Sequence, residues 1–480
     1  MPDMPRSGPT AFVLAGGGTK GSFEVGALQY LVCVEGILPD IITATSAGAL
    51  AATVLAQGRT REEFALRVQE IDDDILAMTR TEYVFGRQGW LRALHGTSLG
   101  GSIEYALTEG TRPPFPRGQT PTEAIAPSGP TRKQRRAAAK DRRRRQRRLA
   151  RLFAGASLRL PRARRQLRTS GSSVLNLEPL AEAMRQGGPS GIRAVDPSLI
   201  ARPGLQLRLA VTALRAGVLR YVTESGTIVE ADAMTPADGP AAGPVDLVEG
   251  ALASASVPLV FPPRALADDD YVDGGVVQVI PVRAAVQLGA TRIIAVVAMP
   301  LELARDERDF TNGSAAHIAL RAMGMIGLAD RQYENLATPR PDGTTLTTID
   351  PVVDVVGIFE VQQGLLRINK DYGWLRAADI LADGDTELKA GVADHTHVLI
   401  QTRVGAWDIE ERLWSGASGE NLAGDLALLR EHKEQIRALA DERKQLGFPV
   451  PDGCEDWWTE YEAHDQPRPD HLPAAPSATH

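Results

Sequence analysis

Short apolar runs and segments with helical spacing alternate along the first part of the chain. Residues 11–15 and 41–45 are apolar or small almost throughout, which is typical of parallel strands buried on both faces. Between them, apolar side chains recur every three or four residues from Ser22 to Val34, and Gly36 suits the end of that helix. Residues 47–56 predict a second helix. This order predicts a βαβα unit with right-handed parallel connections.

The same patterns extend along the chain. Alternating or apolar runs predict strands at 205–214, 219–222, 227–230 and 292–298, of which the middle two form a hairpin. Helical periodicity predicts helices at 61–78, 176–184, 245–255 and 282–288, and a tight turn is expected at 271–275. After Met299 the strand signal weakens. Helices are predicted there at 315–337, 364–381 and 421–446, with one strand at 397–402.

The predicted fold class is therefore α/β, with a mostly parallel central sheet flanked by helices and a helical C-terminal extension. Composition divides the chain further. We expect the α/β domain in two parts, 1–111 and 173–300, with a basic and disordered insertion, 112–172, between them. A mainly helical region, 301–463, and a disordered tail, 464–480, are expected to follow.

The insertion differs sharply in charge from the rest of the chain. The whole protein has a formal net charge of −7, yet residues 131–168 contain 17 Lys or Arg and one acid, Asp141. Such a segment is expected to contact anionic membrane lipid. Nucleic acid is not predicted as a partner, because aromatic residues are not interleaved with the arginines. A flexible charged insert without a specific partner is equally consistent with the composition.

Composition also indicates the broad class of the protein. With 43% hydrophobic and 24% charged residues, the 480-residue chain is typical of a soluble globular protein. No apolar run is long enough to span a membrane, and the N-terminus lacks the pattern of a secretory signal. Two cysteines do not make a disulfide framework. We expect a cytoplasmic protein, peripheral at the membrane if the insertion binds lipid. Its oligomeric state is not predicted.

A glycine-rich loop follows the first predicted strand. The sequence GGGTKG, residues 16–21, contains the G-x-G-x-x-G spacing of dinucleotide-binding loops. Those loops require an acidic residue at the end of the next strand, whereas this strand ends in Thr45 and Ser46. The spacing of a phosphate-binding P-loop is absent as well. A nucleotide-binding module stays open as a weaker alternative.

Ser46 is the candidate nucleophile. It lies at a predicted strand-to-helix turn, where a strained backbone needs small neighbours, and Ala44, Ala47 and Gly48 meet that need. The positive end of the following helix favours developing negative charge. The backbone amides of the loop, at Gly16, Gly17 and Gly18, are the candidate oxyanion donors, each with an effect of roughly 3–4 kcal/mol.

A serine nucleophile needs a base. Eight histidines are present, and the candidates among them are His95, His317, His395 and His397; none lies in a recognisable motif. An α/β-hydrolase esterase with His395 or His397 as base stays an alternative. Asp273 is the better candidate, because Gly274 and Gly275 follow it and allow another backbone to approach closely. A carboxylate becomes a useful base when its surroundings are partly dry.

Three motifs together resemble the patatin-like phospholipase family. In chain order they are GGGTKG, ATSAG around Ser46, and Asp273-Gly274-Gly275. The segment 253–263 and the strand and helix at 281–297 are similar to that family too, so the resemblance covers residues 10–110 and 173–300. It implies a lipid acyl hydrolase of the phospholipase A or esterase type, with a Ser46–Asp273 dyad, no histidine and no metal or cofactor. A lipid or phospholipid is then the implied substrate.

The resemblance also implies supporting roles for Lys20, Gly21, Gly48, Gly274 and Gly275. Two positions depart from the family pattern: Ala44 stands where a glycine is usual, and Lys20 where an arginine is usual. Lysine keeps the charge and loses the bidentate geometry. A non-enzymatic protein that binds anionic membranes through the basic insertion is the last alternative.

Overall fold

A computed structural model describes residues 8–77, 84–87, 173–188, 193–232, 234–235, 244–267, 269–302, 318, 321, 326–382, 386–464, 466–470 and 472. The predicted basic insertion at 112–172, His95 and His317 lie outside these residues, as does most of the predicted tail. Among the described helices, none combines the length and the apolar character that a membrane span requires.

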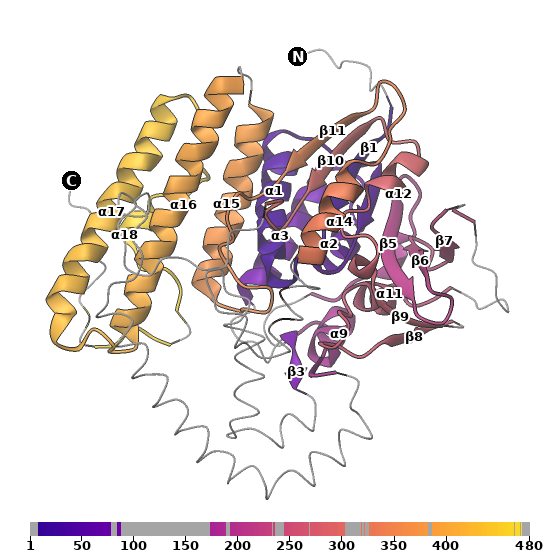
Figure 1. Ribbon diagram of the computed structural model, residues 1–480, viewed down its shortest axis with the longest axis horizontal. Coiled ribbons are helices and arrows are strands. Elements are labelled where there is room, and N and C mark those ends of the chain that lie inside the picture. The colour runs from indigo at the N-terminus through magenta and orange to yellow at the C-terminus, as the bar shows by residue number, and fades with distance from the viewer. Residues whose placement is uncertain are drawn as a thin grey trace, which may run out of the picture.

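A mixed sheet forms the centre of the molecule (Figure 1). Its main path runs β11–β10–β1–β2–β5–β6–β7, and the contacts from β11 to β5 are parallel. The strands on this path are β1 (Thr10–Leu14), β2 (Ile41–Ala44), β5 (Gln206–Ala213), β6 (Val218–Thr223), β7 (Ile228–Glu230), β10 (Arg292–Val296) and β11 (Thr345–Ile349). The mostly parallel sheet predicted from the sequence is confirmed, including the β6–β7 hairpin.

Three elements of the sheet differ from the prediction. The expected tight turn at 271–275 is instead the end of a strand, β9 (Asp269–Asp273), followed by a 3-10 turn over Gly274–Val276. β9 pairs with β8 (Arg264–Leu266) and β5, both antiparallel. The apolar pattern does not predict β11, because its sequence TLTTI is polar and the strand is partly exposed on the edge of the sheet. A short pair, β3 (Gly86–Arg87) with β4 (Leu175–Asn176), lies apart from the main sheet.

Helices cover both faces of the sheet, because alternate residues of each buried strand point to opposite sides. One core lies between the sheet and α1, α2, α3, α9, α11 and α15, and it contains the strand residues Phe12, Leu14, Ile42 and Ile294. The second core lies between the sheet and α12 and α14, and it contains Val13, Ile41 and Ile293. The bounds are α1 (Ser22–Gln29), α2 (Ala47–Leu55), α3 (Arg61–Ala77), α9 (Glu178–Gln186), α11 (Leu247–Ser254), α12 (Val282–Gln287) and α14 (Gly327–Leu336). A π-helical turn, Tyr30–Val34, extends α1, and a short helix, α10 (Pro197–Ile200), precedes β5.

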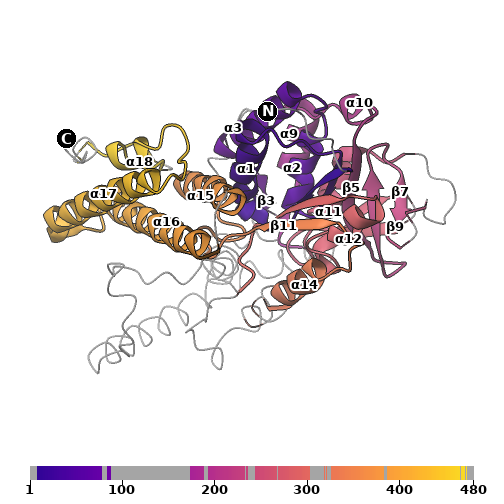
Figure 2. The same ribbon diagram turned by 90° about the horizontal axis from the view of Figure 1, so that it is seen from above.

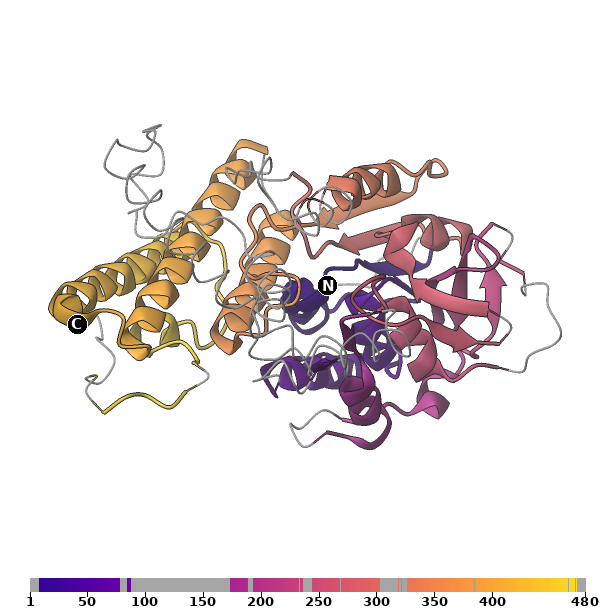
Figure 3. The same cartoon turned by 60° about the horizontal axis from the view of Figure 1, so that its bottom comes forward.

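The C-terminal part of the chain is helical, as predicted. α15 (Gln363–Leu381), α16 (Thr386–Trp414) and α17 (Leu422–Gln445) lie side by side at one flank of the sheet domain, with the short α18 (Asp456–Thr459) against them (Figures 1, 2 and 3). The predicted strand at 397–402 is wrong, because these residues belong to α16. Their β-branched side chains favour a strand locally, yet buried Thr396, Leu399, Ile400 and Arg403 recur with helical spacing and pack against neighbouring helices.

α15 joins this helical region to the sheet domain by an unusually close contact with α1. A Cβ added at Gly26 would lie 1.8 Å from the carbonyl oxygen of Lys370, and one added at Gly373 would lie 1.9 Å from that of Phe23. Phe23 and Tyr372 meet edge to face, 5.5 Å apart at their ring centroids. The two glycines therefore let the helix backbones touch, and the C-terminal region is packed directly beside the first βαβ unit.

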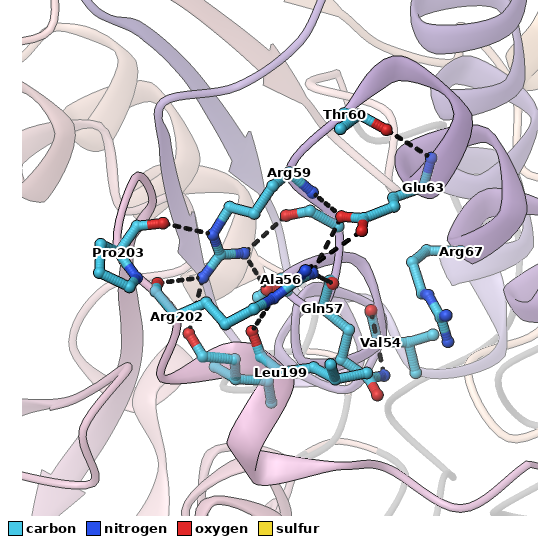
Figure 4. A network of polar contacts seen from close by, with 12 residues as sticks. Val54, Ala56, Gln57, Arg59, Thr60, Glu63, Arg67, Leu199, Arg202 and Pro203 are labelled. Carbon is cyan, nitrogen blue, oxygen red and sulfur yellow. Dashed lines mark hydrogen bonds and ion pairs between the residues drawn. The ribbon is translucent and has the colours of Figure 1, made fainter.

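The C-terminal end of α2 is held by an arginine network (Figure 4). The guanidinium of Arg59 donates to the carbonyls of five residues in two segments: Ala56 and Gly58 beyond α2, and Ile200, Arg202 and Pro203 before β5. Arg202 in turn binds both carboxylate oxygens of Glu63, at 3.1 and 2.9 Å, and Glu63 accepts the amide of Arg59. These bonds satisfy carbonyls that the end of a helix leaves without partners.

Candidate active site

Sheet topology brings Ser46 and Asp273 together from positions far apart in the sequence. β2 pairs with residues 206–209 of β5 and ends at Ala44, opposite Leu209. β9 runs the other way and ends at Asp273, opposite Val211. Because β6 occupies the other edge of β5 along 208–213, β2 and β9 share one edge and meet end to end. Two residues along a strand span about 7 Å, so the residues that follow the two strand ends are neighbours.

Ser46 occupies a strained turn between β2 and α2. Its backbone angles are φ 56° and ψ −127°, a region that residues other than glycine rarely adopt. Ser254 Oγ, at the end of α11, accepts the Ser46 amide at 3.0 Å and holds this geometry. The turn is tight: a Cβ at Gly48 would lie 2.7 Å from the carbonyl oxygen of Ala15. These features are those of a nucleophile elbow, in which the serine side chain is presented by a strained turn.

Asp273 is buried beside the serine, with 4% of its surface exposed. The Ser46 side chain lies near its carboxylate, and the amide of Gly275 donates to its Oδ1 at 2.7 Å. Burial raises the pKa of Asp273 to about 6, although the Ser46 side chain and the Gly275 amide act to lower it. The carboxylate is therefore a stronger base than an exposed aspartate, and it lies near the hydroxyl that needs a base.

Gly274 is required by the close approach of β5. A Cβ at Gly274 would lie 2.4 Å from the carbonyl oxygen of Ala210. Asp273 is fixed on both sides by its backbone, since its amide donates to Ser256 at 3.0 Å and its carbonyl accepts the Thr212 hydroxyl at 3.1 Å. The position of the Asp273 backbone is thus fixed by bonds to the residues after α11 and to β5.

The glycine loop lies directly against Ser46. A Cβ at Gly16 would lie 2.8 Å from the Cβ of Ser46, and one at Gly21 would lie 3.4 Å from that of Ala47. The amide of Gly16 donates to the carbonyl of Val279 at 3.3 Å, so it is engaged in holding the loop. Gly18 has φ +60°, and among the described residues the amides of Gly17 and Gly18 have no backbone acceptor. These two amides are the stronger oxyanion candidates of the three glycines.

Other residues weighed from the sequence lie elsewhere. Lys20 is buried and pairs with Asp354, not with the dyad. His395 and His397 are on α16, and His395 Nε2 lies 3.3 Å from Glu442 on α17. Ser254, which receives the Ser46 amide, was not predicted to have a role; its sequence, ASAS, carries no signal for one. Within the described ranges, no group of three or more His, Cys, Asp or Glu is arranged to hold a metal ion.

A family model described as patatin-like phospholipase matches residues 12–286, which include the glycine loop, Ser46 and Asp273. The chain belongs to the patatin-like phospholipase family. A search of curated proteins gives no significant match.

Two solved structures show weaker similarity to this patatin-like chain. VipD from Legionella pneumophila is 14% identical, with 94% of this chain and 83% of that one covered and a TM-score of 0.27. The heterodimeric ExoU–SpcU complex from the type III secretion system of Pseudomonas aeruginosa is 16% identical, with 94% and 68% covered and a TM-score of 0.24. These TM-scores are too low to support any statement about this chain.

Proposed function

We propose that this protein is a lipid acyl hydrolase of the phospholipase A or esterase type and that Ser46 and Asp273 form its catalytic dyad. The observation that carries the proposal is the placement of Ser46, at the end of β2, beside the buried carboxylate of Asp273, at the end of β9, whose pKa is raised to about 6. Membership of the patatin-like phospholipase family supports a lipid substrate. A base of this strength needs no histidine between it and the serine.

In the first half-reaction, Asp273 accepts the proton of the Ser46 hydroxyl as Oγ bonds to the carbonyl carbon of the ester. The carbonyl oxygen becomes an oxyanion, which accepts hydrogen bonds from the amides of Gly17 and Gly18 and faces the N-terminus of α2. The carbon–oxygen bond to the alcohol then breaks. Asp273 returns its proton to the departing alcohol, which leaves an acyl group on Ser46.

In the second half-reaction, water attacks the acyl carbon and Asp273 accepts a proton from it. The bond to Ser46 Oγ breaks, Asp273 returns the proton to the serine, and a free carboxylic acid is released. The strained elbow contributes to both steps because it holds the nucleophile beside its base and beside the donors before substrate binds.

We also propose that residues 131–168 bring the enzyme to anionic membranes, on the basis of their charge alone. Sedimentation with phosphatidylserine vesicles tests this. Deleting the segment should abolish co-sedimentation while hydrolysis of a short-chain, water-soluble ester is retained. Equal sedimentation of both proteins would contradict the proposal.

Labelling with a serine-reactive fluorophosphonate tests the dyad. We expect one labelled peptide that contains Ser46, no label in Ser46→Ala, and strongly reduced label in Asp273→Asn. Ser225→Ala is the matched control, since Ser225 is an exposed serine in the β6–β7 hairpin. Hydrolysis by an active protein whose label maps to another serine would overturn the mechanism.

A further inference from the structure

The candidate oxyanion loop is held mainly by residues that follow the part of the chain matched by the family model. That match ends at residue 286. Residues 354–369, here called the supporting segment, lie more than 330 positions after the loop in the sequence, yet they contact three successive loop residues, Gly18, Thr19 and Lys20.

The first of these contacts fixes the backbone at the donors. The Thr19 amide donates to the carbonyl of Ile358 at 2.9 Å, and the Thr19 hydroxyl donates to the carbonyl of Gly357 at 2.6 Å. A Cβ at Gly18 would lie 2.2 Å from the same Ile358 oxygen. The supporting segment therefore packs closely against Gly18 and binds the residue that follows it.

An ion pair makes the second contact. Lys20 is only 2% exposed, and its ammonium group binds Asp354 Oδ1. A buried ammonium is costly unless it is paired, and Asp354 is the partner found for it among the described residues. The Lys20 carbonyl accepts the side-chain amide of Asn369 at 3.1 Å, and that amide also donates to Ser22 Oγ at 2.8 Å. Both ends of Lys20 are thereby tied to the C-terminal region.

We propose that Asp354 is a positioning residue for the oxyanion loop and that the supporting segment is an integral part of the active site. The inference rests on the proposed function. Asp354 acts through Lys20: when the pair is lost, the 3-10 turn at Gly18–Gly21 is free to shift, and the amides of Gly17 and Gly18 no longer point to the position of the oxyanion. Transition-state stabilisation is lost, while ground-state binding of the lipid is kept.

Asp354→Asn in the full-length protein tests the proposal, with Lys370→Gln as matched control. Lys370 lies on α15 near the same interface, and its ammonium group pairs with Asp72 on α3 at 3.0 Å. We expect kcat to fall about 10- to 100-fold in Asp354→Asn with KM changed less than about twofold, because misplaced donors affect the transition state. Lys370→Gln should lower the melting temperature with kcat unchanged. Lys20→Arg, which keeps the charge, should retain most of the activity.

Hydrogen exchange of the peptide that contains residues 15–21 gives a readout independent of catalysis. It should accelerate in Asp354→Asn and stay at the parent rate in Lys370→Gln. Unchanged exchange and unchanged kcat in Asp354→Asn, or equal losses of kcat in both variants, would overturn the proposal. If the parent protein neither hydrolyses esters nor labels at Ser46, the proposed function fails, and hydrogen exchange alone then decides whether Asp354 holds the loop.

Discussion

The two ends of α2 differ in how well their surroundings stabilise them. At its N-terminus, Ser46 has a positive φ and lies near a buried carboxylate whose pKa is raised. At its C-terminus, Arg59 donates to five carbonyls and Arg202 binds both oxygens of Glu63 (Figure 4). The N-terminal end combines a strained backbone at Ser46 with a neighbouring buried carboxylate. The other end satisfies its polar groups almost completely.

This difference indicates how the fold keeps a destabilised site in place. A backbone in a rarely populated region costs of order 1–3 kcal/mol and persists only where the surroundings fix it. The Arg59 network ties the far end of the same helix to the loop before β5, and the stability that these bonds contribute offsets part of that cost. Variants at the N-terminal end should then lose activity and gain stability, whereas variants at the C-terminal end should lose stability and keep activity.

Replacing Ser46 should have the largest effect on activity. Ser46→Ala and Ser46→Gly both remove the nucleophile, so kcat/KM for ester hydrolysis should fall by about 10⁴-fold or more. The two variants should differ in stability. Glycine adopts φ 56° and ψ −127° without strain, so Ser46→Gly should be more stable than Ser46→Ala by about 1 kcal/mol in urea unfolding. Equal stability would mean that the elbow is not strained.

The next largest effect is expected from Asp273→Asn, which should lower activity and raise stability. Activity should fall about 10²- to 10⁴-fold, because the base is lost. The folded pKa of Asp273, about 6, lies above its unfolded value, 3.8. The carboxyl therefore stabilises the fold least above pH 6, where the folded state must hold a buried charge. Asp273→Asn should be more stable than the parent by up to about 3 kcal/mol at pH 8 and should lose that advantage as the pH falls towards 4.

The same pKa fixes the pH dependence of the parent enzyme. Asp273 accepts a proton only when it is ionised, so kcat/KM should rise with pH through about 6 and level off above it. Stopped assays between pH 4.5 and 8 measure this profile. A profile that is flat through this range would exclude Asp273 as the base.

The C-terminal end of α2 gives the opposite expectation. Arg59→Met removes all the guanidinium bonds to carbonyls around residues 56–58 and 200–203, and partial rehydration limits the cost to about 2–3 kcal/mol. The folded protein should label with fluorophosphonate at the parent rate below its melting temperature. A large loss of labelling without a loss of stability would show that the C-terminal end of α2 serves activity and not stability.

Sequence patterns predicted the first half of this site more fully than the second. The glycine loop, β2, Ser46 and α2 lie within forty consecutive residues, and their apolar pattern specifies a strand–helix–strand unit. The two glycines identify Asp273, yet the pattern at β9 predicts a turn, because three consecutive acids followed by one apolar pair show no clear alternation. The meeting of β2 and β9 on one edge of β5 depends on pairing between strands far apart in the sequence, which local patterns do not encode.

The C-terminal contribution could not be predicted for the same reason. Asp354 follows a polar edge strand in a segment without periodicity, and nothing near it indicates a partner more than 330 residues earlier. The strand predicted at 397–402 was wrong because Thr and Val favour strands locally, whereas packing between α15 and α17 selects a helix. Tertiary contacts decided both cases.

The smallest effect is expected from the histidines of α16. His395→Ala and His397→Ala should leave kcat/KM within about twofold of the parent, because α16 packs between α15 and α17 and His395 lies beside Glu442. Ester hydrolysis by both variants measures this, with Asp273→Asn as the positive control for a lost base. The result separates the dyad from an α/β-hydrolase mechanism, since only the latter requires an imidazole. A loss as large as that of Asp273→Asn in either histidine variant, with the melting temperature unchanged, would move the base from β9 to the C-terminal helices.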